Sequence, residues 1–372
     1  MKTLIVFGTR PEAIKMAPVV KELQKSAILQ VRVCVTAQHR AILDQILQFF
    51  DITPDHDLNA MRPDQALDQL TARLLVGVGG VLDVEKPDLV LVHGDTTTTF
   101  ASAISAFYRG IPIGHVEAGL RSGSLRAPFP EELNRKITSL VTTQHFVPTE
   151  RSKENLLGEG VDLKNIYLTG NTVIDALLET AQRFRSTPAL VEPFKARFAF
   201  LGDLQVILVT GHRRESFGEG FENICAAMID IVTQNQNVQI VYPVHPNPNV
   251  FEPVNRLLGG HPRIHLIEPL DYSPFVYLME RSHFIITDSG GVQEEAPSLG
   301  KPVLVMRDTT ERPEAVDAGT VILVGTSRAR ILLEANRLLR DNDHYLRMSR
   351  SINPYGDGNA AKRIRVAIEE RN

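Results

Sequence analysis

Ionisable side chains in this chain gather near the ends of short apolar runs and in the segments that follow them. In the first half these are the carboxylates Asp95, Glu117 and Glu131, and in the second half the imidazole of His212. Ligands of parallel α/β sheets bind beyond the carboxyl ends of the strands, so residues directly after strands are the candidates for chemistry. Carboxylates and imidazoles act as general acids and bases. The sequence therefore predicts proton transfer by these four groups.

A second group of residues suits an anion with two phosphates. Its cations are Arg10, Lys15, Arg213 and Arg312. Ser289, Gly290 and Gly291 come after an apolar run and open a helix, so a hydroxyl and backbone N–H groups can donate to phosphate oxygens. Glu295, about one turn further on, can accept from two ribose hydroxyls. We expect chemistry on a nucleotide sugar.

The residues of the first half also have structural interpretations. Asp95 stands before four threonines and could be a helix N-cap. Glu131 and Arg135 have the i, i+4 spacing of a helix ion pair. Glu117 ends an apolar run, where a buried carboxylate with a purely structural role needs a cationic partner. The shared placement at strand ends favours a ligand site.

Ser289, His212 and Arg10 also have structural interpretations. Ser289 could be an N-cap, and His212 beside two arginines could lie in a solvated corner. Arg10 precedes a proline and a glutamate, which is typical of the first turn of a helix. These alternatives stay open at the level of single residues.

Composition narrows the class of protein. The net charge of −4 argues against a general nucleic-acid binder. Cys34 and Cys225 are too few for a disulfide framework, which suits a reducing compartment. The first apolar run is shorter than a signal peptide requires, and no stretch approaches the ~20 apolar residues of a membrane span. We expect a cytoplasmic enzyme without a membrane partner.

Short runs rich in Val, Ile and Leu alternate with longer stretches of helical spacing. They lie at 2–8, 31–37, 88–95, 111–119, 145–148 and 166–170, and again at 205–211, 238–245, 263–269, 283–287, 301–306 and 320–325. Continuous apolar strands that alternate with helices form parallel sheets covered on both faces. Two such sets predict an α/β fold with two Rossmann-like domains and a cleft between them.

The strand signals pause after Gly170, and Pro188 and Pro193 interrupt the helical stretches that follow. We expect residues 1–170 to form the N-terminal Rossmann-like domain with the proton-transfer residues. Residues 171–357 then form a linker helix and a C-terminal, nucleotide-binding Rossmann-like domain. A last helix, at about 358–372, is expected to pack back on the first domain.

Several competing motifs are absent from the sequence. It contains neither G-x-x-x-x-G-K-[ST] nor G-x-G-x-x-G. The stretch from Gly356 to Ala361 fits the looser G-x-G-x-x-A pattern, but no strand precedes it and no βαβ unit can follow. His212 and Glu215 form only half of a metal motif. We expect no nicotinamide cofactor and no metal.

Long motifs along nearly the whole chain resemble those of a known family of enzymes. They are GTRPEAIKMAP, TAQHR, HGDTTTT, HVEAGLRSG, PEELNR, GNTVIDAL, GHRRE, YPVHPNPNV, DSGGVQEEAPSLGKPVL, MRDTTERPE and NPYGDG. Together they resemble the non-hydrolysing UDP-N-acetylglucosamine 2-epimerases of bacteria. The resemblance implies a glycosyltransferase-B type fold and a homodimer. It also implies interconversion of UDP-N-acetylglucosamine and UDP-N-acetylmannosamine, which supplies surface polysaccharides such as capsule.

The substrate of that family dictates a mechanism. No carbonyl acidifies the hydrogen at C2 of the sugar, so a carboxylate cannot remove it directly. If the bond from C1 to UDP breaks as well, elimination gives 2-acetamidoglucal and UDP. Re-addition with protonation from the opposite face gives the epimer, without cofactor or metal.

The resemblance also implies roles for single residues. On UDP it places Arg10, His212, Ser289, Gly290, Gly291, Glu295 and Arg312, with Phe275 on uracil and the backbone near Leu270 at its edge. Around the sugar it places Lys15, Asp95, Glu117, Glu131 and Arg135. The catalytic set is Asp95, Glu117, Glu131 and His212, and which carboxylate serves which face of C2 is left open.

Some members of the family bind a second UDP-N-acetylglucosamine as an activator. The equivalent residues here are Gln38, Glu131, Arg213 and His245. Ala41 and Asp64 stand where some relatives carry a glutamine and an arginine. The resemblance therefore leaves the allosteric response of this chain open.

Three other functions remain as alternatives. A retaining glycosyltransferase of the same fold has no use for three clustered carboxylates. A hydrolysing epimerase releases N-acetylmannosamine and UDP, and is often fused to a sugar kinase. A nucleotide-sugar sensor keeps the UDP residues and loses the proton-transfer set, which this chain retains.

Overall fold

The computed structural model describes residues 1–36, 40–62 and 65–371. The chain forms two compact units. Unit 1 comprises Met1–Ala176 and Tyr355–Asn372, and unit 2 comprises Leu177–Pro354. The division falls within helix α7 (Thr172–Ser186), and the chain returns to unit 1 after Pro354.

Unit 1 is built on a parallel sheet of seven strands in the order β3-β2-β1-β4-β5-β6-β7. The strands are β1 (Lys2–Phe7), β2 (Gln30–Val35), β3 (His56–Asp57), β4 (Leu89–His93), β5 (Ile113–Val116), β6 (Gln144–Val147) and β7 (Ile166–Leu168). The central strands β4 and β5 are buried along their whole length, which explains their continuous apolar sequence.

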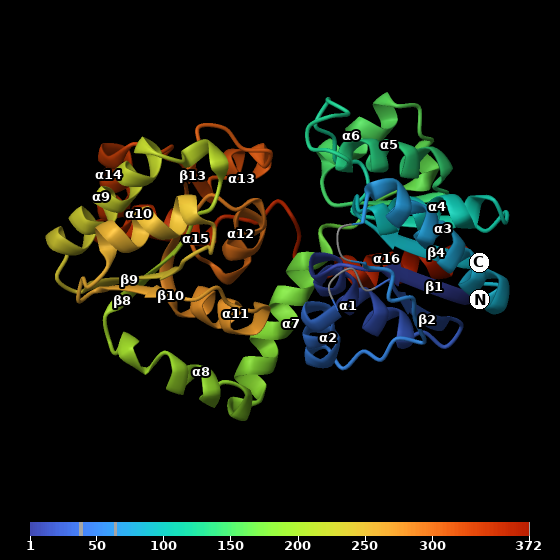
Figure 1. Ribbon diagram of the computed structural model, residues 1–372, viewed down its shortest axis with the longest axis horizontal. Helices are drawn as coiled ribbons and strands as arrows, with labels where there is room; N and C mark the ends of the chain where they lie inside the picture. The colour runs from blue at the N-terminus through green and yellow to red at the C-terminus, as the bar shows by residue number, and fades with distance from the viewer. Residues whose placement is uncertain (37–39, 63–64, 372) are drawn as a thin grey trace. The chain divides into compact units, whose positions relative to one another are not determined.

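Helices cover both faces of this sheet (Figure 1). They are α1 (Arg10–Gln24), α2 (Arg40–Phe49), α3 (Leu67–Glu85), α4 (Thr97–Phe107), α5 (Glu131–Val141), α6 (Glu150–Gly158) and α16 (Ala360–Glu370). Helix α4 packs between α3 and α5, and α1 packs against α2 and α16. Asp175 holds the start of α16, because its carboxylate accepts from the backbone N–H groups of Ala360 and Ala361.

Unit 2 is built on a second parallel sheet, in the order β10-β9-β8-β11-β12-β13. Its strands are β8 (Gln205–Thr210), β9 (Val238–Pro243), β10 (Ile264–Ile267), β11 (Ser282–Thr287), β12 (Val303–Val305) and β13 (Val321–Leu323). Strands β8 and β11 pair in register, with Thr210 opposite Thr287, so the loops that follow them are neighbours.

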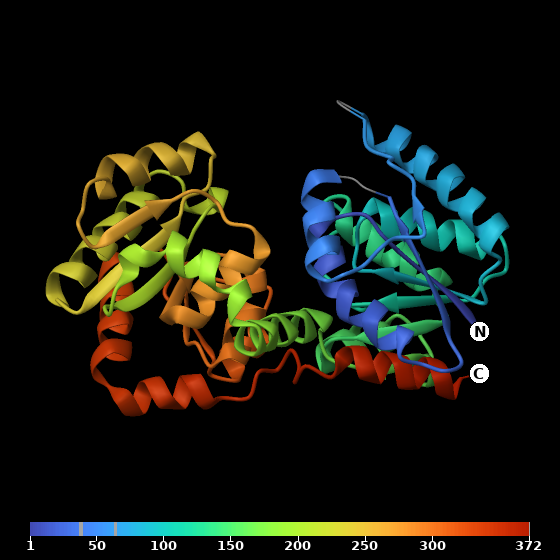
Figure 2. The same cartoon turned by 90° about the horizontal axis from the view of Figure 1, so that it is seen from below.

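The helices of unit 2 are α8 (Glu192–Arg197), α9 (Glu219–Gln234), α10 (Pro248–Leu258), α11 (Tyr272–Arg281), α12 (Gly290–Glu295), α13 (Pro313–Asp317), α14 (Arg328–Arg340) and α15 (Asn342–Arg350). Helix α9 packs against α10 and α14, as Figure 2 shows from below. The core of this unit includes Phe221, Tyr242 and Phe284, which are fully buried.

Each of the twelve apolar runs overlaps a strand of the structure, which confirms the expected α/β fold with two parallel sheets. Among the described strands, the edge strand β3 is the one that the sequence analysis missed, because its two residues do not make an apolar run. The last helix occupies Ala360–Glu370, in the expected stretch. Among the described residues, no helix is long and apolar enough to span a membrane.

Candidate active site

Asp95 lies in the loop between β4 and α4 and pairs with a cation. Its Oδ2 atom accepts from Arg135 Nη1 at 2.8 Å. The N-cap of α4 is Thr96, whose side chain accepts from the backbone N–H of Thr99. Asp95 is therefore not the N-cap, and its carboxylate is left for another role.

Arg135 is nearly buried and is held by Glu132. Arg135 Nε donates to Glu132 Oε2 at 3.0 Å, while Arg135 Nη1 reaches Asp95. Glu132 is itself fully buried and also accepts from the backbone N–H groups of Ser122 and Gly123. The partners of Arg135 are thus Glu132 and Asp95, rather than the Glu131 that its helical spacing suggested.

Glu117 follows β5 and shares one oxygen between two basic side chains. Its Oε2 atom lies 2.5 Å from Lys15 Nζ and 3.3 Å from His93 Nε2. The backbone of Glu117 has a φ of 61°, a left-handed conformation that costs free energy for a residue with a side chain. Lys15 supplies the cation that a buried Glu117 requires, and His93 is a neighbour that the sequence did not indicate.

The pKa values of the two carboxylates are shifted in opposite directions. Burial raises the pKa of Asp95 above its usual value, and neighbouring Glu117 adds to the rise although Arg135 opposes it. Burial alone would also raise the pKa of Glu117, but Lys15 and His93 hold that pKa well below its usual value. Carboxylates with opposite shifts in one site are suited to different roles in proton transfer.

Glu131 begins helix α5 and contributes to the same electrostatic environment. Its negative charge raises the pKa of Asp95, as does that of Glu117. Its Oε2 atom is buried and has no hydrogen-bond partner within the described part of the chain. Unit 1 therefore brings together the expected sugar residues Lys15, Asp95, Glu117, Glu131 and Arg135.

Glu12 connects two loops of the candidate site. Its Oε2 atom accepts from the backbone N–H groups of Gly8 and Thr9 at 3.0 and 2.8 Å. Its Oε1 atom accepts from the hydroxyls of Thr96 and Thr99 at 2.7 and 3.3 Å. A buried carboxylate thus ties the loop after β1 to the loop that carries Asp95.

Two further side chains fix the carbonyl groups of the Asp95 loop. Asn134 donates to the carbonyl of Asp95 at 2.9 Å, and His115 Nε2 lies 2.7 Å from the carbonyl of Gly94. Complete burial lowers the pKa of His115 to about 3, so the ring is neutral and donates from Nε2. Sequence analysis missed Glu12, Asn134 and His115 because their role depends on contacts across the sheet.

In unit 2, His212 lies beside a buried aspartate. The Oδ2 atom of Asp288 accepts from the backbone N–H groups of His212 and Arg213 at 2.6 and 2.7 Å. Its Oδ1 atom lies 3.2 Å from His212 Nδ1. The imidazole is 43% exposed, whereas Asp288 is 1% exposed, so the ring presents its other side to solvent.

The segment after β11 holds the remaining expected nucleotide residues. Ser289 precedes α12, but its hydroxyl makes no capping bond, which leaves it able to donate to a ligand. A Cβ atom on Gly290 would lie 3.1 Å from Arg312 Cζ, so glycine allows the guanidinium to approach closely. Arg312 Nε also donates to Glu294 Oε1 at 2.8 Å. A Cβ atom on Gly291 would lie 3.8 Å from Glu295 Oε2, which places Glu295 beside the same glycines.

Leu270 and Phe275, the residues expected at uracil, are half-buried at the start of α11. This helix packs against Ala296–Leu299, the segment directly after α12. The Glu295 charge also raises the pKa of Tyr272 in the first turn of α11, although burial is the larger cause. Unit 2 therefore places α11 and Glu295 in one neighbourhood.

Arg10 is exposed at the start of α1 in unit 1. Of the residues expected at an activator, His245 stacks on His212 with ring centroids 5.4 Å apart. Arg213 has a buried Nε atom without a hydrogen-bond partner among the described residues. Gln38 and Asp64 lie outside the described residues, as does the side chain of Ala41.

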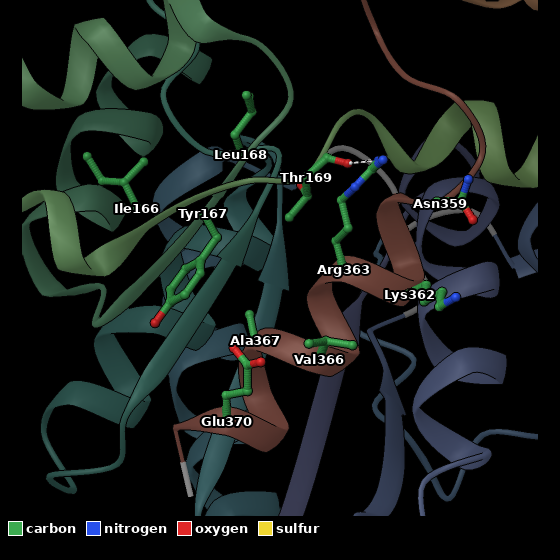
Figure 3. A pocket seen from close by; sticks show the side chains of 10 residues that line it. All are labelled: Ile166, Tyr167, Leu168, Thr169, Asn359, Lys362, Arg363, Val366, Ala367 and Glu370. Carbon is green, nitrogen blue, oxygen red and sulfur yellow. Dashed lines mark hydrogen bonds between the residues drawn. The ribbon is translucent and has the colours of Figure 1, made fainter.

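A hollow of about 600 Å³ lies elsewhere in unit 1, beside β7 and α16 (Figure 3). Its lining includes Tyr167, Arg363 and Val366, and it contains none of the expected catalytic residues. We therefore do not assign it to the reaction. Among the described residues, no group of three or more His, Cys, Asp or Glu side chains could hold a metal ion.

Comparison with known proteins agrees with this arrangement. Residues 21–369 match the family model described as UDP-N-acetylglucosamine 2-epimerase. The chain belongs to the UDP-N-acetylglucosamine 2-epimerase family.

Relatives in this family match over nearly the whole chain. A Ralstonia solanacearum relative is 60% identical over 99% of this chain and 98% of its own length. UDP-N-acetylglucosamine 2-epimerase of Escherichia coli K12 is 59% identical with the same coverage. The Neisseria meningitidis UDP-GlcNAc 2-epimerase, solved with UDP-GlcNAc bound, covers 100% of both chains at 51% identity with a TM-score of 0.89. The enzyme is thus an isomerase with the fold of this family.

Proposed function

We propose that this epimerase interconverts UDP-N-acetylglucosamine and UDP-N-acetylmannosamine by eliminating UDP to 2-acetamidoglucal and adding it back. The observation that carries the proposal is the pair Asp95 and Glu117, two carboxylates of one site whose pKa values are shifted in opposite directions. Asp95 takes up a proton more readily, whereas Glu117 stays ionised beside Lys15. Such a pair can move protons on and off C2 without a cofactor.

The proposal assigns the steps to named groups. As the C2 proton leaves to a carboxylate, the C2–H electron pair forms the C1=C2 double bond of 2-acetamidoglucal, and the electron pair of the C1–O bond goes to UDP. In re-addition the UDP oxygen bonds to C1 again, and C2 takes a proton from the opposite face, which gives the epimer. Asp95, Glu117 and Glu131 are the proton-transfer groups, and Lys15 and Arg135 orient them around the sugar.

UDP is assigned to Arg10, His212, Ser289, Gly290, Gly291, Glu295 and Arg312, with Phe275 and Leu270 at the uracil. The support within unit 2 is the Ser289 hydroxyl, which makes no capping bond to α12, the Arg312 guanidinium beside Gly290 and the Glu295 carboxylate beside Gly291. These groups offer donors for phosphate oxygens and an acceptor for ribose hydroxyls. His212 assists the departure of UDP.

The test is to incubate the enzyme with UDP-N-acetylglucosamine in deuterium oxide and follow the products by NMR. Elimination and re-addition predict UDP-N-acetylmannosamine with one deuterium at C2. The rate should not change after exhaustive dialysis against chelator or on addition of NAD. Activity that required NAD, or product without deuterium, would contradict the mechanism.

The same spectra separate the alternative activities. A hydrolysing epimerase accumulates free N-acetylmannosamine and UDP instead of the epimeric nucleotide sugar. A glycosyltransferase needs an added acceptor, and a sensor leaves the nucleotide sugar unchanged. The expected result is an equilibrium mixture of the two nucleotide sugars.

We also propose a homodimer. Helices α3 and α4 pack side by side, and large apolar side chains are exposed on them and directly after α4: Val76, Val84, Phe107 and Tyr108 are 78, 74, 56 and 75% exposed. Exposed apolar groups on neighbouring helices are typical of an interface between proteins. In sedimentation experiments the wild type should be a dimer, and Val76→Lys should dissociate more readily into monomers. A monomeric wild type would exclude this assembly.

Two further expectations belong to the same proposal. We place the reaction in the cytoplasm, to which the free buried thiols of Cys34 and Cys225 are suited. A second UDP-N-acetylglucosamine at Gln38, Glu131, Arg213 and His245 would make the initial rate rise sigmoidally with substrate. A hyperbolic dependence for the wild type would exclude such activation.

A further inference from the structure

Asp288 is a buried carboxylate to which the reaction scheme has given no role. It follows β11, and the register of β11 with β8 brings it beside the loop that starts at Gly211. A Cβ atom on Gly211 would lie 3.1 Å from the Tyr242 hydroxyl and 3.7 Å from Asp288 Oδ2. Glycine at 211 therefore allows this loop to approach the carboxylate closely.

The two oxygens of Asp288 have different partners. Oδ2 holds the loop, because it accepts from the backbone N–H groups of His212 and Arg213. Oδ1 lies 3.2 Å from His212 Nδ1 and, within the described residues, accepts no hydrogen bond from elsewhere. One oxygen thus fixes the loop, and the other faces the imidazole.

We propose that Asp288 is a positioning residue that keeps the proton of His212 on Nδ1 and directs Nε2 at the departing diphosphate. A carboxylate at Nδ1 fixes the tautomer and the orientation of a histidine ring and stabilises its charged form. The charged ring then donates from Nε2 to the oxygen that receives the C1–O electron pair. This inference rests on the proposed role of His212 in the departure of UDP.

The surroundings of the ring make a fixed negative charge useful. His245 stacks on His212 with an interplanar angle of 19°, and Arg213 is its neighbour in sequence. Positive charge on either group disfavours a second positive charge on His212. The Tyr242 hydroxyl donates to the Gly211 carbonyl and stays neutral, because burial raises its pKa. Burial would raise the pKa of Asp288 too, but His212 and the two backbone N–H groups lower it, so Asp288 is ionised.

The decisive variant is Asp288→Asn. The amide oxygen can still accept from the two backbone N–H groups, while the amide NH₂ faces Nδ1 and forces the imidazole to carry its proton on Nε2. We expect turnover to fall by about 10²- to 10⁴-fold, with UDP affinity changed by less than about threefold.

A matched control is Asp175→Asn, which changes another buried aspartate whose carboxylate accepts from two backbone N–H groups. It should leave turnover unchanged. In the His212→Ala background, Asp288→Asn should add less than about threefold, because both changes remove the same interaction. If Asp288→Asn lowered turnover by the same factor with and without His212, the two residues would act independently and the inference would be overturned.

A direct measurement keeps the inference testable if the variant folds poorly. In wild-type enzyme labelled with ¹⁵N-histidine and saturated with UDP, the His212 resonances should report a proton on Nδ1. A neutral ring protonated only on Nε2 would overturn the inference even if His212 proved essential. Full activity of His212→Ala would instead contradict the proposed role of His212, while the NMR spectrum would still decide whether Asp288 sets its tautomer.

Discussion

Lys15 Nζ lies 2.5 Å from Glu117 Oε2, although the two residues are 102 positions apart in the sequence. Lys15 lies in α1, and Glu117 directly follows β5. The ion pair therefore connects helix α1 to the carboxyl end of strand β5. Its main effect is to keep Glu117 ionised in a buried place.

Lys15→Met should raise the pKa of Glu117, because burial then acts with less opposition. Ionised Glu117 is lost as the pH falls, so the acid limb of the pH–rate profile should move to higher pH. Stability should fall by up to about 3 kcal/mol, since a buried carboxylate loses a partner. Lys25→Met is the control: that lysine is 69% exposed beside Glu22 and should contribute less than about 1 kcal/mol. An unshifted acid limb would mean that Lys15 does not tune Glu117.

Asp95→Asn, Glu117→Gln and Glu131→Gln keep the approximate shape of each side chain and remove its base. We expect each to lower turnover by about 10²- to 10⁴-fold. UDP should bind as in the wild type, because the nucleotide is assigned to other groups; calorimetric titration measures this. Asp83→Asn, at a carboxylate 65% exposed, should have normal turnover. Near-normal rates for all three site variants would make the carboxylates structural.

Glu12→Gln should disturb the Asp95 loop without touching substrate. The amide NH₂ must face either two backbone N–H groups, which need an acceptor, or two threonine hydroxyls, which would have to turn from donating to accepting. We expect a loss of about 1–3 kcal/mol in unfolding free energy and a fall in kcat larger than the rise in KM. Thr96→Val removes one donor and should couple with Glu12→Gln in a double-mutant cycle. Additive effects of the two changes would argue against a shared contact.

Asp175 predicts a pH dependence of stability. Burial raises its pKa from the usual 3.8 to about 6, so between these values the folded state binds more protons than the unfolded state. Stability from this group is therefore present below pH 4 and lost as the pH rises through 6, a difference of about 3 kcal/mol. Chemical unfolding from pH 4 to 7 should show a flatter dependence for Asp175→Asn than for the wild type. Identical slopes would contradict the prediction.

The strands and the polar residues after them could be predicted because a buried parallel strand has a continuous apolar sequence and ends at the ligand edge of its sheet. The partners of those residues could not. Arg135 has helical spacing from Glu131, yet it pairs with Glu132 and with Asp95, forty positions away. Similarly, the sequence indicates only that His93 ends a strand. The register of β4 with β5 is what brings its side chain to Glu117. Side-chain pairing depends on register and rotamers, which one sequence does not specify.

Unit 1 is discontinuous in the chain, because α16 packs on α1 after the whole of unit 2 has intervened. During synthesis, unit 2 can therefore complete its core while the apolar surface of α1 that α16 will cover is still open. We expect a nascent chain that stops at Pro354 to contain a protease-resistant unit 2 and a unit 1 that chaperones still recognise. The order of folding would thus run against the order of translation, with the first-made sheet the last to become stable.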